Sequence, residues 1–286
     1  MKLLDGKLVS QKVLSEVKED VEQLKSDGIS PKIAVVMVGD NPASLSYIKQ
    51  KRKACEFTGI EWEQIDLPES TKHEKLIEVV EELNKRKDMH GILVQLPLPD
   101  HIYTPEVIKA IDPKKDVDGF HAYNLGKMFL STDFEELAPC TPMGVIKMLD
   151  EYGIDVAGMD ATVVGASNIV GKPMSTMLLN RQATVTTCHI KTKDLKKNTL
   201  NADLLIVGVG KAGLITADMV KDGAIVVDIG CNRVDGKLCG DVDFDEVAAK
   251  ASYITPVPGG CGPMTVACLM ENTVIACERL TKEKDL

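Results

Sequence analysis

The residues best suited to chemistry lie in a basic run, SYIKQKRKAC, at positions 46–55. If residues 43–58 form a helix, a rotation of 100° per residue places Lys51 among uncharged neighbours: Ser44, Tyr47, Ile48, Ala54, Cys55 and Thr58. Lys49 and Lys53 then point to the opposite side, and Arg52 lies on the flank. An amine on a packing face loses water and its pKa falls, which suits it to proton transfer. The alternative is a lysine whose stem passes the core and carries its charge to solvent.

Polar residues elsewhere could assist such an amine. Tyr47 lies one helical turn before Lys51 and could orient it or stack on a planar substrate. Gln95 directly follows the apolar run GILV, and a buried amide there needs partners, so it is either structural or a contact for Lys51 or a substrate. Asp116 and Asp118 stand in KKDVDGF, a pattern that is ordinarily only a turn.

A second candidate site is the glycine-rich stretch VVGASNIVGKPMS, in which Gly165 and Gly171 separate an apolar strand from a helix. Backbone amides and a helix N-terminus in such a turn can bind a phosphate. The stretch is not a P-loop, because five residues separate the two glycines and Pro173 replaces the hydroxyl that would hold Mg²⁺. A tight turn that binds nothing is the alternative. The repeated strand–helix–strand pattern around it favours a dinucleotide.

The end of the next strand indicates which dinucleotide. NAD-binding proteins of this type place a carboxylate about 20 residues after the glycine turn, where it accepts the ribose hydroxyls. Here the stretch reads CHIKTKD, with His189, Lys191 and Lys193 before the first acid, Asp194. Cations can pair with a 2′-phosphate, so the sequence favours NADP over NAD. A solvated basic turn is the alternative.

The elements that would position these residues alternate between short apolar strands and amphipathic helices. This pattern predicts parallel sheets covered on both faces, in an α/β protein of two domains. The turn-rich, acidic stretch 112–140 interrupts the alternation, and we expect a domain boundary near 137–144. The expected helices are 8–27, 43–58, 72–87, 104–111, 142–152, 172–181, 216–221 and 264–280, and the expected strands are 32–40, 61–67, 91–100, 160–166, 183–189, 202–210 and 224–230.

Composition excludes several classes of protein. A formal net charge of −9 argues against a protein that coats nucleic acid or an anionic membrane, and KQKRK lacks the interleaved aromatics of a nucleic-acid surface. The N-terminus does not have the pattern of a signal peptide, and no apolar run reaches the length of a membrane span. The eight cysteines and five histidines show no metal-ligand spacing. We therefore expect a reduced, cytoplasmic protein without a metal.

Taken together, the motifs resemble those of the bifunctional methylenetetrahydrofolate dehydrogenase/methenyltetrahydrofolate cyclohydrolase family. The resemblance is carried, in order along nearly the whole chain, by Tyr47-x-x-x-Lys51, VQLPLP, KDVDGFH, PCTP, VVGASNIVGKPMS and ITPVPGGCGPMT. It implies an N-terminal α/β catalytic domain over 1–139, completed by a C-terminal helix in 264–286. It also implies a doubly wound Rossmann domain over 140–263 that binds NADP, and a homodimer formed through these Rossmann domains.

The resemblance implies two reactions on tetrahydrofolate one-carbon derivatives: NADP-dependent oxidation of 5,10-methylenetetrahydrofolate and hydrolysis of the product to 10-formyltetrahydrofolate. It assigns catalysis to Lys51, Tyr47, Gln95 and Asp118, with Lys51 as acid and base, Gln95 supporting it and Asp118 rather than Asp116 binding the pterin. Substrate contacts fall on Tyr47, Val94, Gln95, Leu96, Asp118, Pro258, Gly259, Gly260, Cys261 and Gly262. Cofactor contacts fall on Gly165, Ala166, Ser167, His189, Ile190, Lys191, Thr192 and Cys231.

The chain departs from the family's pattern at a few of these positions. Cys231 and Cys261 stand where aliphatic residues are more common, and Ala122 stands where proline is usual. Ala166 occupies a place that is arginine in some members, which leaves the preference for NADP mainly to the basic turn at 189–193. Two other readings stay open: a monofunctional NAD(P)-dependent dehydrogenase, which would not need Lys51, and a nucleic-acid-binding protein that uses KQKRK.

Overall fold

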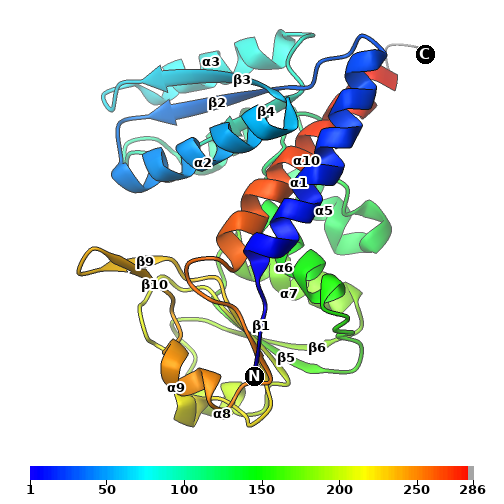
Figure 1. Ribbon diagram of the computed structural model, residues 1–286. Coiled ribbons are helices and arrows are strands. Elements are labelled where there is room, and N and C mark those ends of the chain that lie inside the picture. Colours follow the sequence, from blue (N-terminus) through cyan, green and yellow to red (C-terminus); the bar gives the residue numbers. More distant parts are fainter. Residues whose placement is uncertain (283–286) are drawn as a thin grey trace. The chain divides into compact units, whose positions relative to one another are not determined.

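The structure is a computed structural model that describes residues 1–282, and its chain divides into two compact units (Figure 1). The six-stranded unit comprises Met1–Ser10, Met128–Phe134 and Thr141–Thr265. The three-stranded unit comprises Gln11–Lys127, Glu135–Cys140 and the described chain from Val266 onward. Two long helices, α1 (Gly6–Ser26) and α10 (Cys261–Lys282), have residues in both.

The six-stranded unit is built on one wholly parallel sheet with the strand order β1-β11-β8-β7-β5-β6. Its strands are β1 (Lys2–Leu3), β5 (Asp160–Val164), β6 (Thr184–Cys188), β7 (Leu204–Val207), β8 (Ile225–Asp228) and β11 (Tyr253–Ile254). From β5 the chain runs outward to β6 and then crosses to β7 on the other side of β5. The order of strands therefore reverses between β5 and β7, where sheets of this kind bind their ligands.

Helices cover both faces of this sheet, which is what makes it doubly wound. On one face, Val164, Leu205 and Val226 pack with residues from α8 (Leu195–Thr199), the 3₁₀ helix η2 (Ala217–Met219) and α9 (Phe244–Ala248). Successive side chains of a strand alternate between faces, so Val163, Ile206 and Val227 face the other side. That side carries α7 (Gly171–Asn180), which contributes the buried Met174, Met177 and Leu178. The predicted fold class is confirmed.

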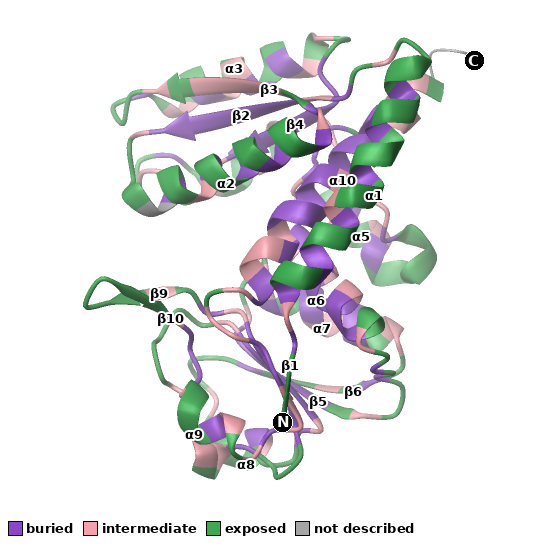
Figure 2. Ribbon diagram, viewed as in Figure 1, coloured by how far each residue is buried: buried purple, intermediate pink, exposed green. Residues whose placement is uncertain are grey.

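The three-stranded unit has the parallel order β3-β2-β4. Its strands are β2 (Lys32–Val38), β3 (Glu61–Leu67) and β4 (Gly91–Val94), and its helices include α2 (Pro42–Thr58), α3 (His73–Lys85) and α4 (Thr104–Ala110). The helix α5 (Ala122–Leu130) begins in this unit, and its residues from Met128 onward belong to the six-stranded unit. Ala34, Val36 and Val38 of β2 share one hydrophobic core with residues of α3, β4 and α4. Figure 2 shows β2 and β4 buried, while one side of α2 and of α3 is exposed.

The elements that the sequence did not predict are short or held by distant contacts. They include α5 inside the stretch expected to be turns, α8, α9, β1, β11 and a hairpin of β9 (Asn232–Val234) and β10 (Lys237–Cys239). The helix expected at 216–221 is only the three-residue η2. The strand expected at 91–100 ends at Val94, because the chain turns at Gln95 before Pro97. The N-terminal strand β1 pairs with β11, so the first residues belong to the six-stranded unit.

The helix expected at 264–280 is α10, which begins earlier, at Cys261, and ends at Lys282. Residues 283–286, which the assignment of 264–286 to the catalytic domain includes, lie outside the described residues. Within residues 1–282, no helix combines the length and apolarity that crossing a membrane requires.

Candidate active site

Lys51 lies on the buried face of α2. Its exposed fraction is 6%, whereas Lys49, Arg52 and Lys53 of the same run are exposed. Its neighbours on that face, among them Ile48 and Cys55, are buried as the 100° rotation predicts, except for the half-buried Tyr47. The orientation predicted for Lys51 is therefore confirmed, and the alternative of a lysine that carries its charge into solvent is wrong.

The Lys51 amine has a defined partner. Its Nζ donates a hydrogen bond of 3.0 Å to Oε1 of Gln95, at the carboxyl end of β4. Nε2 of Gln95 donates to the carbonyl of Leu96 at 2.7 Å, which keeps the amide oxygen directed at the amine. The backbone N–H of Gln95 donates to the carbonyl of Val36 at 2.8 Å, so the residue is anchored to the sheet. Gln95 therefore holds the amine in one orientation.

Asp118 reaches the same edge of the sheet because the preceding residues run beside β4. Asp116 pairs with Ile92 in a parallel bridge, and the N–H of Ile92 donates to the carbonyl of Lys115 at 2.8 Å. The turn then closes at Gly119, where φ is +77° and a Cβ would overlap the backbone at Ala138. Only glycine fits this conformation and this approach.

The two aspartates of this turn have different surroundings. Asp116 is 1% exposed, and its Oδ2 accepts from the N–H of His121 at 2.7 Å and from Nδ2 of Asn124 at 2.9 Å. It therefore fixes the start of α5. Asp118 is half-buried and interacts electrostatically with Lys51. The structure thus brings Asp118, and not Asp116, together with the amine.

Burial moves both groups toward their neutral forms. Removal from water lowers the pKa of Lys51, and the negative charge of Asp118 opposes that shift. Removal from water also raises the pKa of Asp118, which the Lys51 charge opposes and the Asp116 charge reinforces. A lysine with a lowered pKa and a carboxyl with a raised pKa are characteristic of sites that move protons.

Two contributors to this site carried no predicted role. Cys140 hydrogen-bonds Asp118 and donates to the carbonyl of Val117 at 3.3 Å, and burial raises the pKa of its thiol well above the ordinary value. Asn272 of α10 donates through Nδ2 to the carbonyls of Val117 at 2.9 Å and Ala138 at 3.0 Å. The available signal for Asn272 was a polar residue inside the apolar run of a helix. Its partners could not be read from the sequence.

Tyr47, Val94 and Leu96 lie on the elements that carry Lys51 and Gln95. Tyr47 is half-buried, one turn before Lys51 on α2. Val94 is the buried last residue of β4, and the half-buried Leu96 follows Gln95. The roles predicted for these three residues stay predictions.

The glycine-rich turn lies at the reversal of strand order in the six-stranded sheet. Gly165 directly follows β5, has φ of +124°, and has no room for a Cβ beside the carbonyl of Gly208, which follows β7. Gly171, the first residue of α7, has no room for a Cβ beside the carbonyl of Gly165. Oγ of Ser167 accepts from the N–H of Val170 at 3.2 Å. The backbone is therefore compact here, with the half-buried Ala166 and the exposed Ser167 in the loop that leads to α7.

The basic turn after β6 is held by His189. The N–H of His189 donates to Oγ1 of Thr192 at 2.9 Å, and the N–H of Lys191 donates to Nδ1 of His189 at 3.1 Å. Ile190 is 98% exposed, and Lys191 and Lys193 are exposed too. Asp194 caps α8 by accepting from the N–H of Lys197, so this carboxylate is occupied by the helix. The turn thus presents cations at the position where a ribose-binding acid would stand.

The segment from Pro258 to Gly262 is fixed by backbone contacts within the six-stranded unit. The N–H of Lys7 donates to the carbonyl of Gly259 at 2.9 Å, and Gly6 has no room for a Cβ beside Gly260. Cys261 is buried, which raises the pKa of its thiol, while Cys231 is exposed. The substrate and cofactor contacts predicted for these residues stay predictions.

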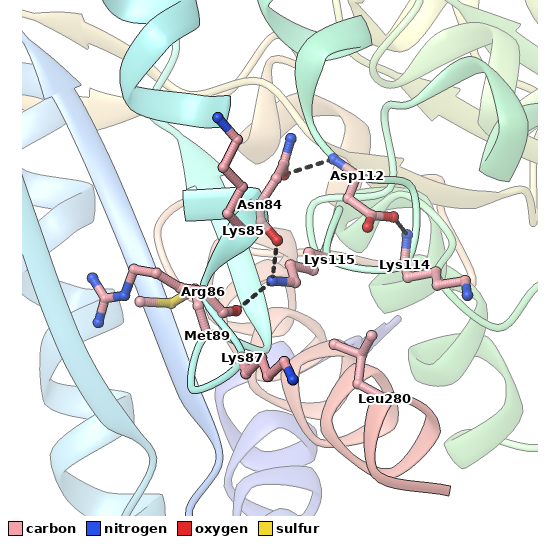
Figure 3. Close-up of a pocket in the computed structure, with 9 residues that line it drawn as sticks. All are labelled: Asn84, Lys85, Arg86, Lys87, Met89, Asp112, Lys114, Lys115 and Leu280. Carbon is pink, nitrogen blue, oxygen red and sulfur yellow. Dashed lines mark hydrogen bonds between the residues drawn. The ribbon is translucent and has the colours of Figure 1, made fainter. Parts of the chain in front are cut away.

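A cavity of about 290 Å³ lies beside the end of α3 and is lined by none of the predicted site residues (Figure 3). It is lined by Asn84, Lys85, Arg86, Lys87, Met89, Asp112, Lys114, Lys115 and Leu280. Nζ of Lys115 donates to the carbonyls of Asn84 at 2.8 Å and Arg86 at 2.7 Å, so this buried lysine satisfies the end of the helix. We assign the cavity no catalytic role, because its lining includes no residue predicted for catalysis, substrate or cofactor.

Comparison with known proteins gives a consistent result over the full length. Two family models match: tetrahydrofolate dehydrogenase/cyclohydrolase, catalytic domain, over residues 4–118, and the NAD(P)-binding domain of the same family over residues 139–281. A relative from Nautilia profundicola, bifunctional protein FolD, is 55% identical over 284 residues, which cover 99% of each chain.

Solved structures of the same kind superpose closely. The bifunctional enzyme FolD, methylenetetrahydrofolate dehydrogenase/cyclohydrolase, from Campylobacter jejuni matches with a TM-score of 0.94 at 54% identity, covering 98% of this chain and 99% of that one. The methylenetetrahydrofolate dehydrogenase-cyclohydrolase of Trypanosoma brucei, complexed with NADP and an inhibitor, matches with a TM-score of 0.93 at 34% identity, covering 97% of each.

Proposed function

The chain belongs to the tetrahydrofolate dehydrogenase/cyclohydrolase family, and from this membership we propose that it catalyses both reactions of that name. It oxidises 5,10-methylenetetrahydrofolate with NADP and hydrolyses the resulting 5,10-methenyltetrahydrofolate to 10-formyltetrahydrofolate, in one-carbon metabolism. The observation that carries the proposal is the buried Lys51 amine, held by Gln95 beside Asp118. A dehydrogenase alone has no use for it, so the monofunctional alternative is not favoured.

In the hydrolytic step, Lys51 acts as both base and acid. Water adds to the methenyl carbon, and the neutral amine of Lys51 takes the proton that the water loses. The ammonium of Lys51 then returns this proton to N5 as the bond from that carbon to N5 breaks. The hydroxyl of the adduct loses its proton to solvent as the C=O forms, which leaves the formyl group on N10. The lowered pKa of Lys51 increases the fraction of neutral amine available for the first transfer. Gln95 Oε1 accepts from the amine and so directs it throughout.

Asp118 and Tyr47 position the substrate. The pterin ring presents N–H donors along one edge, and a carboxylate accepts such donors in pairs. Asp118 suits this task because the turn around Gly119, fixed by Asn272, holds its backbone. Tyr47, one turn from Lys51, packs against the planar ring. Both reactions use the same bound folate, so both depend on these two residues.

The six-stranded unit is suited to NADP. The compact glycine backbone at Gly165 and Gly171, next to the start of α7, is of the kind that binds a pyrophosphate, and Ala166 and Ser167 lie in the same turn. His189, Ile190, Lys191 and Thr192 form the turn that would receive the 2′-phosphate, and Cys231 is expected to line the site. Bound there, NADP would supply the acceptor for the hydride of the one-carbon bridge. This step needs orientation by the protein and moves no proton.

The remaining assignments rest on the family. We propose a catalytic domain of residues 1–139 completed by 264–286, and an NADP-binding domain of residues 140–263; within the first range, Met1–Ser10 and Met128–Phe134 pack with the six-stranded unit. The two family models, which end at 118 and begin again at 139, support a boundary in this region. We also propose that the enzyme acts as a homodimer in the cytoplasm. Size-exclusion chromatography with light scattering tests the dimer.

Two assays test the proposal on one preparation of the protein. Reduction of NADP in the presence of 5,10-methylenetetrahydrofolate reports the dehydrogenase, and loss of methenyltetrahydrofolate absorbance without nucleotide reports the cyclohydrolase. We expect both activities. An enzyme that reduces NADP but does not hydrolyse methenyltetrahydrofolate above the rate in buffer would support the monofunctional alternative.

A further inference from the structure

Asp241 is a buried carboxylate with no predicted role, and four donors point at it. Its Oδ2 accepts from the backbone N–H groups of Val209 at 2.6 Å and Gly210 at 2.9 Å. Its Oδ1 accepts from the N–H of Lys211 and from Nδ2 of Asn232, each at 2.8 Å. The residue is 0% exposed. A single side chain thus binds three consecutive amides of one loop.

That loop lies at the reversal of strand order. It follows β7, and the N–H of Gly208 donates to the carbonyl of Val164 at 2.9 Å, immediately before Gly165. The carbonyl of Gly208 takes the space that a Cβ of Gly165 would need. The Val209–Lys211 loop is therefore a neighbour of the glycine turn at the edge where a dinucleotide binds.

Asp241 is itself held rigidly by a second buried carboxylate. Oδ1 of Asp228, at the end of β8, accepts from the N–H groups of Gly230 at 2.8 Å and Asp241 at 3.0 Å. Its Oδ2 accepts from the N–H of Val242 at 2.9 Å. Glycine at 230 and at 240 leaves room for the two carboxylates, since a Cβ would overlap Asp241 or Asp228. The sheet therefore holds Asp228, Asp228 holds Asp241, and Asp241 holds the loop.

We propose that Asp241 is a positioning residue for the dehydrogenase: it fixes the Val209–Lys211 loop as a wall of the nucleotide site. Consecutive backbone N–H groups in a loop commonly bind an anion. Here a carboxylate of the protein occupies them, so they do not serve the pyrophosphate, and that task falls to the turn from Gly165 to Gly171. The inference rests on the proposed function, because it assumes that the nucleotide binds at this edge.

The test is Asp241→Asn, which keeps the shape of the side chain. An amide offers one oxygen in place of two, so at least one pair of the four donors loses its acceptor. We expect the Kd for NADP, measured by calorimetry, to rise about tenfold or more, with a parallel rise in the KM for NADP. Cyclohydrolase activity without nucleotide should stay within about twofold of the wild-type value, because the Lys51 site belongs to the other unit. A loss of both activities in equal measure would overturn the proposal.

Matched variants keep the test decisive. Asp203→Asn removes a more exposed carboxylate of the same unit, one that accepts from the N–H of Asp160 and pairs with Lys221, and it should leave NADP binding unchanged. Asn232→Ala removes only one donor, and it should raise the Kd for NADP about threefold. If Asp241→Asn does not fold, an unchanged Kd in Asn232→Ala refutes the positioning role. A wild-type enzyme that binds NADP but catalyses neither reaction would refute the proposed function. The role of Asp241 would still be decided, because it is tested by comparing the Kd for NADP between the wild type and Asp241→Asn.

Discussion

Replacing Lys51 by methionine tests the central chemical assignment. Methionine keeps most of the length and the apolar stem and removes the amine. The structure predicts a tolerable cost to folding: Oε1 of the half-buried Gln95 loses its donor at 3.0 Å, which costs at most about 1–3 kcal/mol. The variant no longer has to bury an amine, which offsets part of this cost. We therefore expect a folded protein with a melting temperature lower by about 2–10 °C.

The two activities should respond differently to Lys51→Met. General acid–base catalysis contributes about 10²- to 10⁴-fold, equivalent to about 3–5 kcal/mol of activation free energy, and the cyclohydrolase should lose at least the lower figure. The dehydrogenase moves no proton and should keep its rate within about threefold. Since burial lowers the pKa of Lys51, the wild-type cyclohydrolase rate should rise with pH as the amine loses its proton, and the variant should lack that rise.

The neighbouring cations supply the controls. Lys49→Met and Lys53→Met make the same chemical change on the exposed side of α2 and should leave both rates unchanged. Methenyltetrahydrofolate hydrolysis followed from pH 6 to 9, with circular dichroism to confirm folding, measures all of these outcomes. Full cyclohydrolase activity in a folded Lys51→Met, or an equal loss in Lys49→Met, would refute the reasoning.

Further predictions concern other sites. Asp118→Asn should lower kcat/KM for both activities in parallel by about tenfold or more, because both use the same bound folate; a loss confined to the cyclohydrolase would place Asp118 in the proton transfer instead. The wild-type enzyme should have a higher kcat/KM with NADP than with NAD, and equal values or a higher value with NAD would contradict this prediction. Replacing Lys191 and Lys193 by alanine should reduce the preference for NADP by about 1–3 kcal/mol. The rate of the cyclohydrolase without nucleotide should not change. Burial raises the pKa of Asp228 to about 6, above the unfolded value of about 3.9. Ionisation of Asp228 therefore lowers the free energy of unfolding by about 3 kcal/mol above pH 6, and this loss of stability disappears as the pH falls toward 4. Urea unfolding from pH 4 to 7 should therefore show this pH dependence in the wild type and not in Asp228→Asn, and parallel curves for the two proteins would count against the shift.

The orientation of Lys51 could be predicted because it depends on one helix alone. A rotation of 100° per residue and the types of its neighbours were sufficient, and the tertiary structure only supplied what the face packs against. Gln95 was similar, since an amide after GILV and before Pro97 must lie near the end of a strand. The choice between Asp116 and Asp118 was different. Both are aspartates in one turn. What distinguishes them is that His121 and Asn124 donate hydrogen bonds to Asp116, and no local sequence pattern specifies these donors.

The features that escaped prediction depend on contacts between distant parts of the chain. The helix α5 lies in a stretch rich in turn residues, and the Asp116 carboxylate fixes its start. Both strands of the β9–β10 hairpin are largely exposed and have little apolar character, so the sequence carries no alternating pattern there. Asp241 resembles any surface aspartate in GDVDF, and its role depends on the Val209–Lys211 loop, which follows a distant strand. The roles of such residues depend on contacts that form only when the chain has folded.

The bond from Asn272 to the carbonyl of Val117 spans 155 positions of the sequence and has a consequence for how the enzyme is made. A chain emerges from the ribosome N-terminus first, so Lys51, Gln95 and Asp118 are all available long before α10 exists. The turn that carries Asp118 nevertheless lacks its hydrogen bond from Asn272 until that helix is complete and has docked. A nascent chain or a fragment that ends before residue 272 therefore contains every proposed catalytic residue of the hydrolytic step and yet lacks the support that holds Asp118 in place. The support for Asp118 is therefore complete only after α10 has been synthesised.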